Sequence, residues 1–494
     1  MSGDDLIGLL DRFQGIRVLV IGESILDGYL RGTASRLCPE APAPVVLLAQ
    51  RSYAPGGAAN TAANLQALGA HATLLSVTGD DAHGQHLRTI IECKGIDISC
   101  LITQPGRLTV AKERVCAGSQ LIVRIDSEDF SEIAQQTETE VLRRLYEFAP
   151  QCDAIVISDY GKGVVTDRVI EALAGLQRRQ PGLLLVDGKD LTRYVAACPT
   201  VVKPNYLQAA DLIGLKEPSG NRAQAILDRS EHLLEATGAR IAAVTIDSDG
   251  SVILERGCHP HRTYAPRTAN PQTAGAGDTF LSVFGLALAA GGSTVHAAEL
   301  ASAASAMVVA KEGTATVSAV ELISHFAGQM KHAPAGSVLE MSLAYERQRG
   351  RRIVFTNGCF DLLHAGHTSY LSRAKSLGDV LVVGVNSDSS VRRLKGDQRP
   401  INPLEDRIHV LAALSCIDYI VAFDEDSPVD LIRRIRPDVF VKGGDYIREA
   451  LPEADVVEAY GGNVEILPYL EDRSTTGMIE EIKRLDLASP ISVR

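Results

Sequence analysis

Several sequence features are missing from the chain, and each absence argues against a class of protein. Its nine cysteines include no Cys-x-x-Cys pair and are odd in number, so we expect reduced, buried thiols in a cytoplasmic protein without structural zinc. The most apolar helix candidate, FLSVFGLALAA after Asp278, has about half the length of a membrane span. The acidic N-terminus has no basic segment leading into a long apolar core. We therefore predict neither a signal peptide nor a membrane partner.

Basic residues are in the minority, which excludes one further class. The sequence has 61 acidic and 49 basic residues and a formal net charge of −12. Sequence-independent binding to nucleic acid relies on basic surfaces, so we expect no nucleic-acid partner, although small basic pockets for phosphates remain possible. The 45% hydrophobic and 22% charged residues are typical of a globular protein. At roughly 100–200 residues per domain, 494 residues predict two to four domains.

Short apolar runs alternate with helical patterns in the first two thirds of the chain. Near-continuous apolar strands separated by helices predict an α/β domain with a parallel sheet covered on both faces. The run from Asp278 to Lys311 then predicts two alanine-rich helices. The predicted strands are Ile16–Gly22, Ala72–Gly79, Ala154–Tyr160, Leu183–Lys189 and Ala242–Asp247.

The alternation of apolar runs with helical patterns stops between Phe326 and Gly350 and then resumes. We predict a first domain over residues 1–328, a loose linker over 329–350 and a smaller domain over 351–494. Five strands in the last part predict a Rossmann-like, doubly wound domain, whose ligands bind at the carboxyl ends of the strands. These strands are Arg352–Gly358, Val380–Asn386, Tyr419–Phe423, Val439–Asp445 and Val464–Tyr469. In NPLEDR we expect Asn402 to cap a helix.

TAGAGDTF at Thr273–Phe280 runs small residues straight into a predicted helix. The backbone N–H groups of Gly275, Ala276 and Gly277 would be unpaired helix-start donors and so favour an anion. Asp278 would then lie beside that anion, where its carboxylate can take a proton from an attacking hydroxyl. The alternative is an ordinary glycine-rich helix start with an acidic residue in its first turn.

Two upstream elements favour the anion-binding interpretation over that of an ordinary helix start. PGGAANTAANLQALG brings Gly57, where the backbone can approach a ligand, and Asn60, an amide for sugar hydroxyls; VIGESILDGY places Asp27 just after the first strand. In this order the motifs resemble the ribokinase-like sugar kinase family over roughly residues 10–320. The resemblance implies that Asp278 is the catalytic base and that the amides of residues 275–277 stabilise the transferred phosphoryl group. It also implies that Asp27, Gly57 and Asn60 hold a sugar, with Mg²⁺ and ATP opposite.

One element departs from that family. KPNYLQ stands where the family has Asn-x-x-Glu, which orders magnesium and the ATP phosphates, and here the glutamate is replaced by Gln208. The resemblance places Asn205, Tyr206, Leu207 and Gln208 at the ATP site. An amide keeps the hydrogen-bonding shape but loses the charge, so we expect a weaker, indirect hold on magnesium rather than an inactive kinase.

TNGCFDLLHAGH at Thr356–His367 collects a cysteine, an aspartate and two histidines. A metal site would need a third ligand, and the spacing matches no familiar zinc pattern. Cys359 lies in an apolar run and is better interpreted as buried than as a nucleophile. Two ordinary core or surface histidines remain an alternative. Phosphate binding fits best, with His364 and His367 donating to a triphosphate at a helix N-terminus.

This stretch resembles the nucleotidyltransferase superfamily that carries the His-x-Gly-His signature. No base or covalent intermediate is required, because a phosphate acceptor is already a nucleophile and the work is positioning and charge neutralisation. The resemblance makes His364 and His367 the catalytic pair. It implies ATP or phosphate binding, or the ordering of such ligands, by Asn357, Gly358, Phe360, Lys395, Arg407, Lys442, Ser474, Thr475 and Thr476.

Together the two halves resemble the bifunctional heptose kinase/adenylyltransferases of Gram-negative lipopolysaccharide synthesis. The resemblance implies phosphorylation of D-glycero-D-manno-heptose 7-phosphate at O1, adenylyl transfer from ATP to heptose 1-phosphate, and a separate phosphatase acting between the two steps. We also expect a homodimer. Cationic candidates for the 7-phosphate are Lys112, Arg114, Arg124, Lys162 and Lys189. Two alternatives remain: another sugar phosphate or CTP as substrate, and a regulatory protein whose kinase half has decayed, suggested by Gln208 alone.

Overall fold

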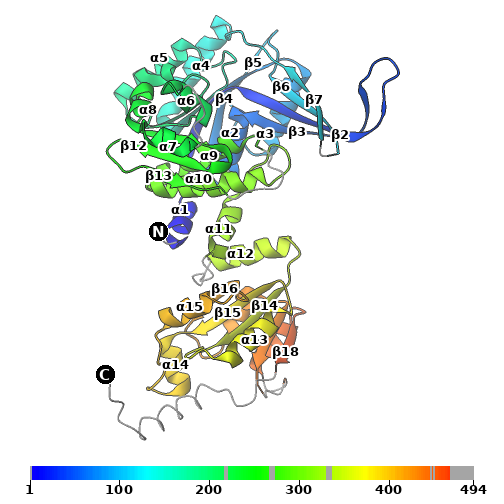
Figure 1. Cartoon of the computed structure of the whole chain (residues 1–494), viewed down its shortest axis with the longest axis vertical. Coiled ribbons are helices and arrows are strands. Elements are labelled where there is room, and N and C mark those ends of the chain that lie inside the picture. The colour runs from blue at the N-terminus through cyan, green and yellow to red at the C-terminus, as the bar shows by residue number, and fades with distance from the viewer. Residues whose placement is uncertain are drawn as a thin grey trace. The chain divides into compact units, whose positions relative to one another are not determined.

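The structure is a computed structural model that describes residues 3–118, 120–215, 221–265, 273–329, 337–444, 448 and 451–467. The chain divides into two compact units, Gly8–Leu322 and a second made of Met1–Ile7 with Ile323–Arg494. Figure 1 shows the elements of each unit. Among the described residues, no helix has the length and apolar character needed to cross a membrane.

A nine-stranded sheet forms the centre of the Gly8–Leu322 unit, and all five predicted strands belong to it. Every neighbouring pair from β5 to β11 is parallel, as predicted, whereas β12 and β13 add antiparallel pairs at one edge. In spatial order the strands are β13 (His261–Thr263), β12 (Ser251–Glu255), β11 (Ile241–Thr245), β10 (Val201–Val202), β9 (Leu183–Gly188), β8 (Ala154–Asp159), β1 (Arg17–Gly22), β4 (His71–Gly79) and β5 (Leu101–Gln104).

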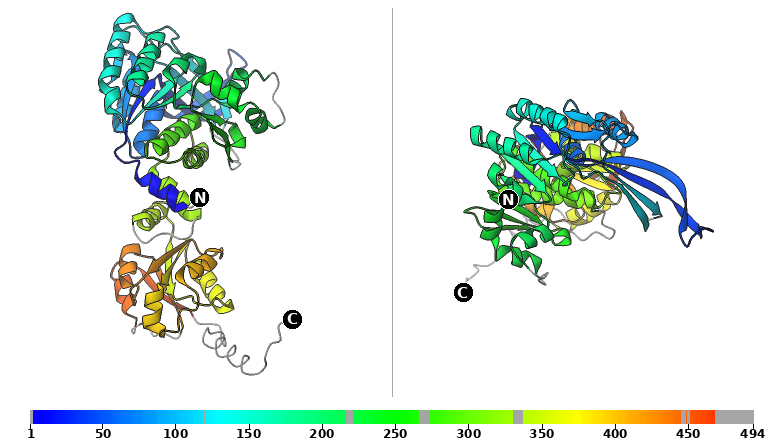
Figure 2. Two further views of the ribbon diagram at one scale, coloured as in Figure 1. Left: turned by 90° about the vertical axis from the view of Figure 1, so that its left-hand side faces the viewer. Right: turned by 90° about the horizontal axis from the view of Figure 1, so that it is seen from above.

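Helices cover both faces of this sheet (Figures 1 and 2), which explains why its strands are almost wholly apolar. Leu19 and Ile21 of β1 pack in one cluster with residues of α4 (Gln135–Phe148), α5 (Asp167–Arg179) and α8 (Ser230–Thr237). The opposite face carries α2 (Ala58–Ala67), α9 (Ala276–Ala289) and α10 (Thr294–Val309). The unit also contains α3 (Ala82–Cys93), α6 (Tyr206–Leu212) and α7 (Arg222–Leu227).

A second sheet, here called the outer sheet, was missed by the sequence analysis. It contains four strands in the order β3 (Pro44–Gly57), β2 (Ser24–Leu37), β6 (Ala111–Ala117) and β7 (Gln120–Ser127). Much of it is exposed, so its strands lack the apolar runs that reveal buried ones. Figure 2 shows the β2–β3 hairpin reaching away from the rest of the unit. Asp27, expected just after the first strand, therefore lies inside β2.

The other unit holds a five-stranded parallel sheet, and all five predicted strands are present. Their order is β16 (Tyr419–Phe423), β15 (Val380–Asn386), β14 (Ile353–Gly358), β17 (Val439–Gly443) and β18 (Asn463–Leu467). The chain therefore reverses its direction of winding between β14 and β17, the place where such sheets bind ligands. Helices α13 (Ala365–Lys375) and α15 (Leu404–Ala412) pack on one face. Further helices are α14 (Asp388–Lys395), α16 (Val429–Ile435) and α17 (Pro452–Glu458).

The expected loose linker over 329–350 is wrong for most of its length. Residues Ser337–Gln348 form helix α12, with Leu339 and Leu343 buried. Arg434 on α16 donates to Glu340 at 2.9 Å, so α12 is joined to the Ile323–Arg494 unit. The charged residues of this segment suggested a solvated linker, but they flank an apolar stripe at helical spacing.

Candidate active sites

Asp278 lies in the first turn of α9, whose N-cap is Gly275. Gly275 has φ +82°, and a Cβ added there would lie 2.6 Å from Nδ2 of Asn60 and 3.2 Å from Cγ2 of Thr314. A glycine is therefore needed for both the left-handed backbone and the close approach. This turn brings the start of α9 against the start of α2.

Three side chains donate to the Asp278 carboxylate. Asn60 Nδ2 lies 2.9 Å from Oδ2, while Tyr160 OH and Thr61 Oγ1 lie 3.1 and 3.3 Å from Oδ1. The predicted Asn60 thus adjoins the predicted Asp278. Thr61 and Tyr160 were not predicted, although Tyr160 follows β8 directly and the carboxyl end of a strand is where site residues gather.

Burial raises the pKa of Asp278 to about 7. The nearby Asp187 adds to this rise, whereas the hydrogen bonds from Asn60 and Tyr160 and the charge of Lys203 oppose it. Burial and Asp278 together raise the pKa of Tyr160 well above its usual value, so this phenol keeps its proton and remains a donor. A carboxylate with a pKa near neutrality is suited to take a proton from a hydroxyl.

Lys203 and Asp187 form an ion pair beside the start of α9. Their Nζ and Oδ2 atoms are 2.9 Å apart, and a Cβ added at Gly277 would lie 3.2 Å from Lys203 Nζ. An ammonium group therefore lies against the glycine-rich turn that was expected to bind an anion. The sequence analysis quoted Lys203 within KPNYLQ but assigned it no role.

Asp27 is tied to the same region. Arg114 NH1 donates to its Oδ1 at 2.7 Å and Thr314 Oγ1 to its Oδ2 at 3.0 Å. The close contact of Thr314 with Gly275 links Asp27 to the start of α9. Gly57, with φ +59°, turns β3 into α2, and a Cβ there would lie 2.4 Å from the Glu23 carbonyl oxygen. Asp27, Asp278 and the neighbouring Gly57 and Asn60 thus come together from three distant stretches.

Gln208 has a structural role at the start of α6. Asn205 accepts from the Gln208 backbone and Gln208 Oε1 accepts from the Asn205 backbone, each at 2.9 Å, which forms a capping box. Its Nε2 also donates to the Gly188 carbonyl at 3.0 Å. A carboxylate could not donate to that carbonyl. Of the other two predicted ATP-site residues, Tyr206 is buried and Leu207 is exposed.

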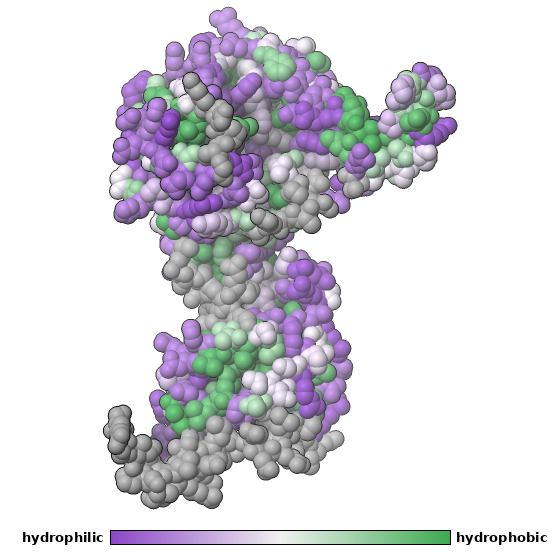
Figure 3. Space-filling view, viewed as in Figure 1, coloured by the Kyte–Doolittle hydropathy of each residue, from purple (hydrophilic) through white to green (hydrophobic). Residues whose placement is uncertain are grey.

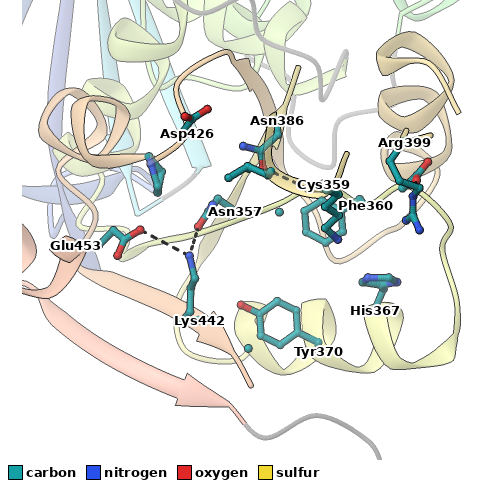
Figure 4. A pocket seen from close by; sticks show the side chains of 16 residues that line it. Asn357, Cys359, Phe360, His367, Tyr370, Asn386, Arg399, Asp426, Lys442 and Glu453 are labelled. Atoms are coloured by element: carbon teal, nitrogen blue, oxygen red, sulfur yellow. Dashed lines mark hydrogen bonds and ion pairs between the residues drawn. The ribbon is translucent and has the colours of Figure 1, made fainter. Parts of the chain in front are cut away.

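The second site is a cavity of about 320 Å³ at the carboxyl ends of the strands of the Ile323–Arg494 unit. Figure 4 shows the side chains that surround it. Lys442 of β17 donates to Asn357 of β14 at 3.2 Å, and its Nζ lies 3.7 Å from Glu453. The predicted residues that line the cavity are Asn357, Gly358, Phe360, His367, Lys395 and Lys442.

His364 and His367 lie with their ring centroids 4.0 Å apart. His364 is the N-cap of α13, and its Nδ1 accepts the Gly366 N–H at 3.2 Å. Burial, with the charges of His364 and Lys395, lowers the pKa of His367 to about 4, so this imidazole is neutral near pH 7. Among the described residues its buried Nδ1 has no hydrogen-bond partner.

Arg407 does not line the cavity. Its side chain is fully buried and donates to the carbonyls of Cys359 at 2.5 Å and Asn402 at 3.1 Å and to Asp388 at 2.7 Å. These contacts fit the ordering of a phosphate-binding loop rather than direct contact with phosphate. We expected Asn402 to cap α15, but the N-cap is Pro403. The Asn402 side-chain amide donates instead to the Asp361 carbonyl.

Arg399 and Asp361 line the cavity as an ion pair that was not predicted. Asp361 accepts the N–H groups of Ile401 at 2.7 Å and Asn402 at 3.0 Å as well as Arg399 Nε. Burial by itself would raise the pKa of Asp361. The three donors outweigh this effect, so the pKa lies below its usual value. The buried carboxylate thus fixes a guanidinium group at the cavity. Spacing gave no signal for this pair, which the fold brings together.

Ser474, Thr475 and Thr476, which were expected to bind ATP or phosphate, lie outside the described residues. Within the described ranges, no group of three or more His, Cys, Asp or Glu side chains is arranged to hold a metal ion.

Comparison with known proteins agrees with the division of the chain into two units. Residues 16–321 match the family model of the pfkB family carbohydrate kinases, and residues 355–483 match the cytidylyltransferase-like model. The bifunctional protein HldE of Geobacter sulfurreducens is 42% identical over 94% of this chain and 96% of its own length. That of Geotalea uraniireducens is 41% identical over 98% and 99%. The chain belongs to the HldE family. It is an enzyme that joins a carbohydrate kinase to a nucleotidyltransferase.

Solved structures resemble the first unit in fold. Escherichia coli phosphofructokinase-2 in complex with substrates and products superposes with a TM-score of 0.53 at 18% identity, covering 63% of this chain and 98% of that one. The same protein in complex with potassium gives 0.52 at 18% identity. The parallel sheet with an added outer sheet is thus the fold of a known sugar-phosphate kinase.

Proposed function

We propose that the Gly8–Leu322 unit phosphorylates D-glycero-D-manno-heptose 7-phosphate at O1 with ATP, and that the Ile323–Arg494 unit transfers AMP from ATP to heptose 1-phosphate. The product would be ADP-heptose for the lipopolysaccharide core, made in the cytoplasm. The single observation that carries this proposal is the buried Asp278 among Asn60, Thr61 and Tyr160, in a chain that matches HldE proteins along nearly its whole length.

In the kinase, Asp278 would accept the proton of the sugar O1 hydroxyl as that oxygen attacks the γ-phosphorus of ATP; the bond from this phosphorus to the bridging oxygen breaks and ADP leaves. Asn60 and Tyr160 hold the carboxylate in place. The N–H groups of Gly275, Ala276 and Gly277 would stabilise the charge on the transferred phosphoryl group, with Lys203 beside them. Asp27 would hold sugar hydroxyls, and the α6 start with Asn205 and Gln208 would border the nucleotide.

In the nucleotidyltransferase, the acceptor phosphate itself would attack the α-phosphorus of ATP, and pyrophosphate would leave. His367 and His364 would donate to the triphosphate, and Lys442 and Lys395 would neutralise its charge. Arg407 orders the Cys359 carbonyl beneath this site. Proximity and electrostatic complementarity would account for the rate, without a covalent intermediate.

Mg²⁺ would enter both sites with ATP. Such ions are bound through substrate phosphates and one or two carboxylates rather than by all-protein cages. In the kinase, Asp187 fits this role because its partly exposed carboxylate lies near the anion-binding turn. The ion would neutralise phosphate charge. A separate phosphatase would remove the 7-phosphate between the two reactions.

The outer sheet supports a homodimer. Leu121, Val123 and Ile125 alternate along β7 and are each about half exposed, and Leu37 and Leu47 of the β2–β3 hairpin are more exposed still. Figure 3 shows apolar side chains gathered over this sheet. An exposed apolar stripe on a sheet is a surface that a second copy of the chain would cover. Val123→Asp should shift the protein toward monomer in analytical ultracentrifugation; an unchanged sedimentation coefficient would exclude this face.

Product analysis tests the proposed reactions. Purified protein is incubated with ATP, CTP and heptose 7-phosphate, with and without a 7-phosphatase, and products are identified by mass. We expect the 1,7-bisphosphate without phosphatase and ADP-heptose only with it. A CDP-linked product, or no bisphosphate, would overturn the assignment of the nucleotide or of the sugar.

A further inference from the structure

The five basic residues considered for the distal phosphate of the sugar differ in their surroundings. Arg124 is exposed on β7, and its Nε and NH2 each donate to Asp126 at 2.8 Å. Lys189 is exposed beyond the end of β9. Arg114 is paired with Asp27 at 2.7 Å. Among the described residues, the two remaining candidates, Lys112 and Lys162, both form ion pairs with the same carboxylate, that of Glu128.

Lys112 lies between the two ends of the sugar site. It is in register with Asp27 in the parallel β2–β6 pair, so both side chains lie on the same face of the outer sheet. Arg114, two residues along, shares that face and reaches Asp27. Lys112 Nζ also lies 6.0 Å from the centroid of the Tyr160 ring, whose hydroxyl donates to Asp278. A sugar held by Asp27 and Asp278 would therefore have Lys112 beside it.

Lys162 holds the shared carboxylate. Its Nζ is 2.7 Å from Glu128 Oε2 and 3.5 Å from the centroid of the Phe130 ring, and its side chain is 10% exposed. Lys112 Nζ is 4.0 Å from Glu128 Oε1. Two ammonium groups with one carboxylate leave one positive charge in a partly buried place, which favours an anion. Because Glu128 is bound more closely by Lys162, Lys112 is the cation left for a ligand.

We propose that Lys112 binds the phosphate monoester at the far end of the sugar substrate and that Lys162 is a positioning residue that holds Glu128 away from it. This inference rests on the proposed function of the kinase unit, since it assumes a sugar between Asp27 and Asp278. The Lys112 ammonium group would bind the doubly charged phosphate of the substrate. This contact would come in addition to the hydroxyl contacts that any sugar would make.

The test compares a phosphorylated sugar with the same sugar lacking its phosphate. Lys112→Met should raise KM for heptose 7-phosphate about 10- to 100-fold, the range expected for one lost charge-assisted hydrogen bond, and leave kcat/KM for unphosphorylated heptose within about twofold. Lys112→Arg should recover most of the loss. The matched control is Arg179→Gln, which removes an exposed charge from the last turn of α5 and should change neither KM.

Equal losses on both sugars in Lys112→Met would overturn the subsite and make Lys112 a general structural residue. Calorimetric binding without ATP separates this failure from a failure of the proposed function. A wild-type protein that binds heptose 7-phosphate more tightly than heptose but phosphorylates neither sugar would contradict the proposed reaction and keep Lys112 in its role. Equal affinity of the wild-type protein for both sugars would contradict the subsite.

Discussion

Asn60 and Asp278 stand 218 positions apart in the chain, yet the amide of the first donates to the carboxylate of the second at 2.9 Å. The bond joins the starts of α2 and α9, two helices on the same face of the central sheet. In the proposed reaction, Asn60 would contact the sugar hydroxyls and Asp278 would act as the base. Their pairing would then place the hydroxyl to be phosphorylated next to the group that deprotonates it.

The two activities should be separable by single substitutions. Asp278→Asn should lower kinase kcat by about 10²–10⁴, the usual contribution of a general base, while adenylyl transfer from supplied heptose 1-phosphate is retained. His367→Ala should do the reverse. Coupled assays on each half-reaction measure both rates. Loss of both activities in either variant would contradict the independence of the sites.

The kinase should lose activity in mild acid. With a pKa of about 7, Asp278 becomes protonated below neutrality and can no longer accept a proton. We expect kinase kcat/KM to fall nearly tenfold per pH unit well below pH 7. Asp278→Asn serves as the control, because its residual kinase activity uses the same substrates but lacks the titrating carboxylate. An acid limb of the same steepness in this variant would refute the assignment.

Asp278 should also weaken the fold in alkaline solution. The pKa of Asp278 is higher in the folded protein than the ordinary aspartate value of 3.8, so the stability that it contributes is present below pH 3.8 and is lost as the pH rises to about 7. Asp278→Asn should therefore unfold at a higher temperature than wild type at pH 8. That advantage should shrink at pH 5. Calorimetric scans at both values check the sign.

Arg407 should prove structural. Replacing it with methionine leaves Asp388 and two carbonyls without their donor, and a buried polar group left without its partner costs about 1–3 kcal/mol. We expect a lower unfolding free energy of the Ile323–Arg494 unit in urea, an unchanged KM in adenylyl transfer and normal kinase activity. Arg399→Gln is the contrast: its side chain lines the cavity, so we expect a raised KM in adenylyl transfer, together with a loss of stability because it leaves the buried Asp361 carboxylate without its cation. A stable Arg407→Met protein with only a raised KM would indicate a direct phosphate contact instead.

Gln208→Ala should loosen the start of α6. The substitution removes the Gln208 side-chain half of the capping box and the donation to Gly188, while the cap that Asn205 places on the backbone N–H of residue 208 remains. A lost hydrogen bond of this kind costs about 1 kcal/mol. Gln208→Glu is the informative partner, because it keeps the cap but places a carboxylate against the Gly188 carbonyl. Thermal unfolding should rank wild type first, and magnesium titration of the kinase should show a lower requirement in Gln208→Glu. An unchanged requirement would mean that residue 208 does not act on the ion.

The sequence predicted the buried parts of the molecule better than the exposed parts. Both central sheets were found because strands covered on two faces are apolar throughout, as in Val380–Asn386. The outer sheet was missed because β2 mixes polar and apolar residues. Glycine-rich turns and spacing singled out Asp278, Asn60 and His367. The structure places the first two in contact and the third at the cavity, and their catalytic roles stay predictions. Tyr160, Lys203 and Arg399 were not assigned, because only the fold brings them to their partners.

The pairing of β2 with β3 shifts register between Arg31 and Gly32 and again between Ala34 and Arg36. Both irregularities lie between Asp27 and the exposed end of the hairpin, so a change in length beyond them need not propagate to the sugar site. The hairpin tip is thus free to lengthen, shorten or change sequence while Asp27 keeps its alignment. Under the proposed function, the surface at the hairpin tip and the sugar contact at Asp27 are therefore structurally separate parts of one hairpin.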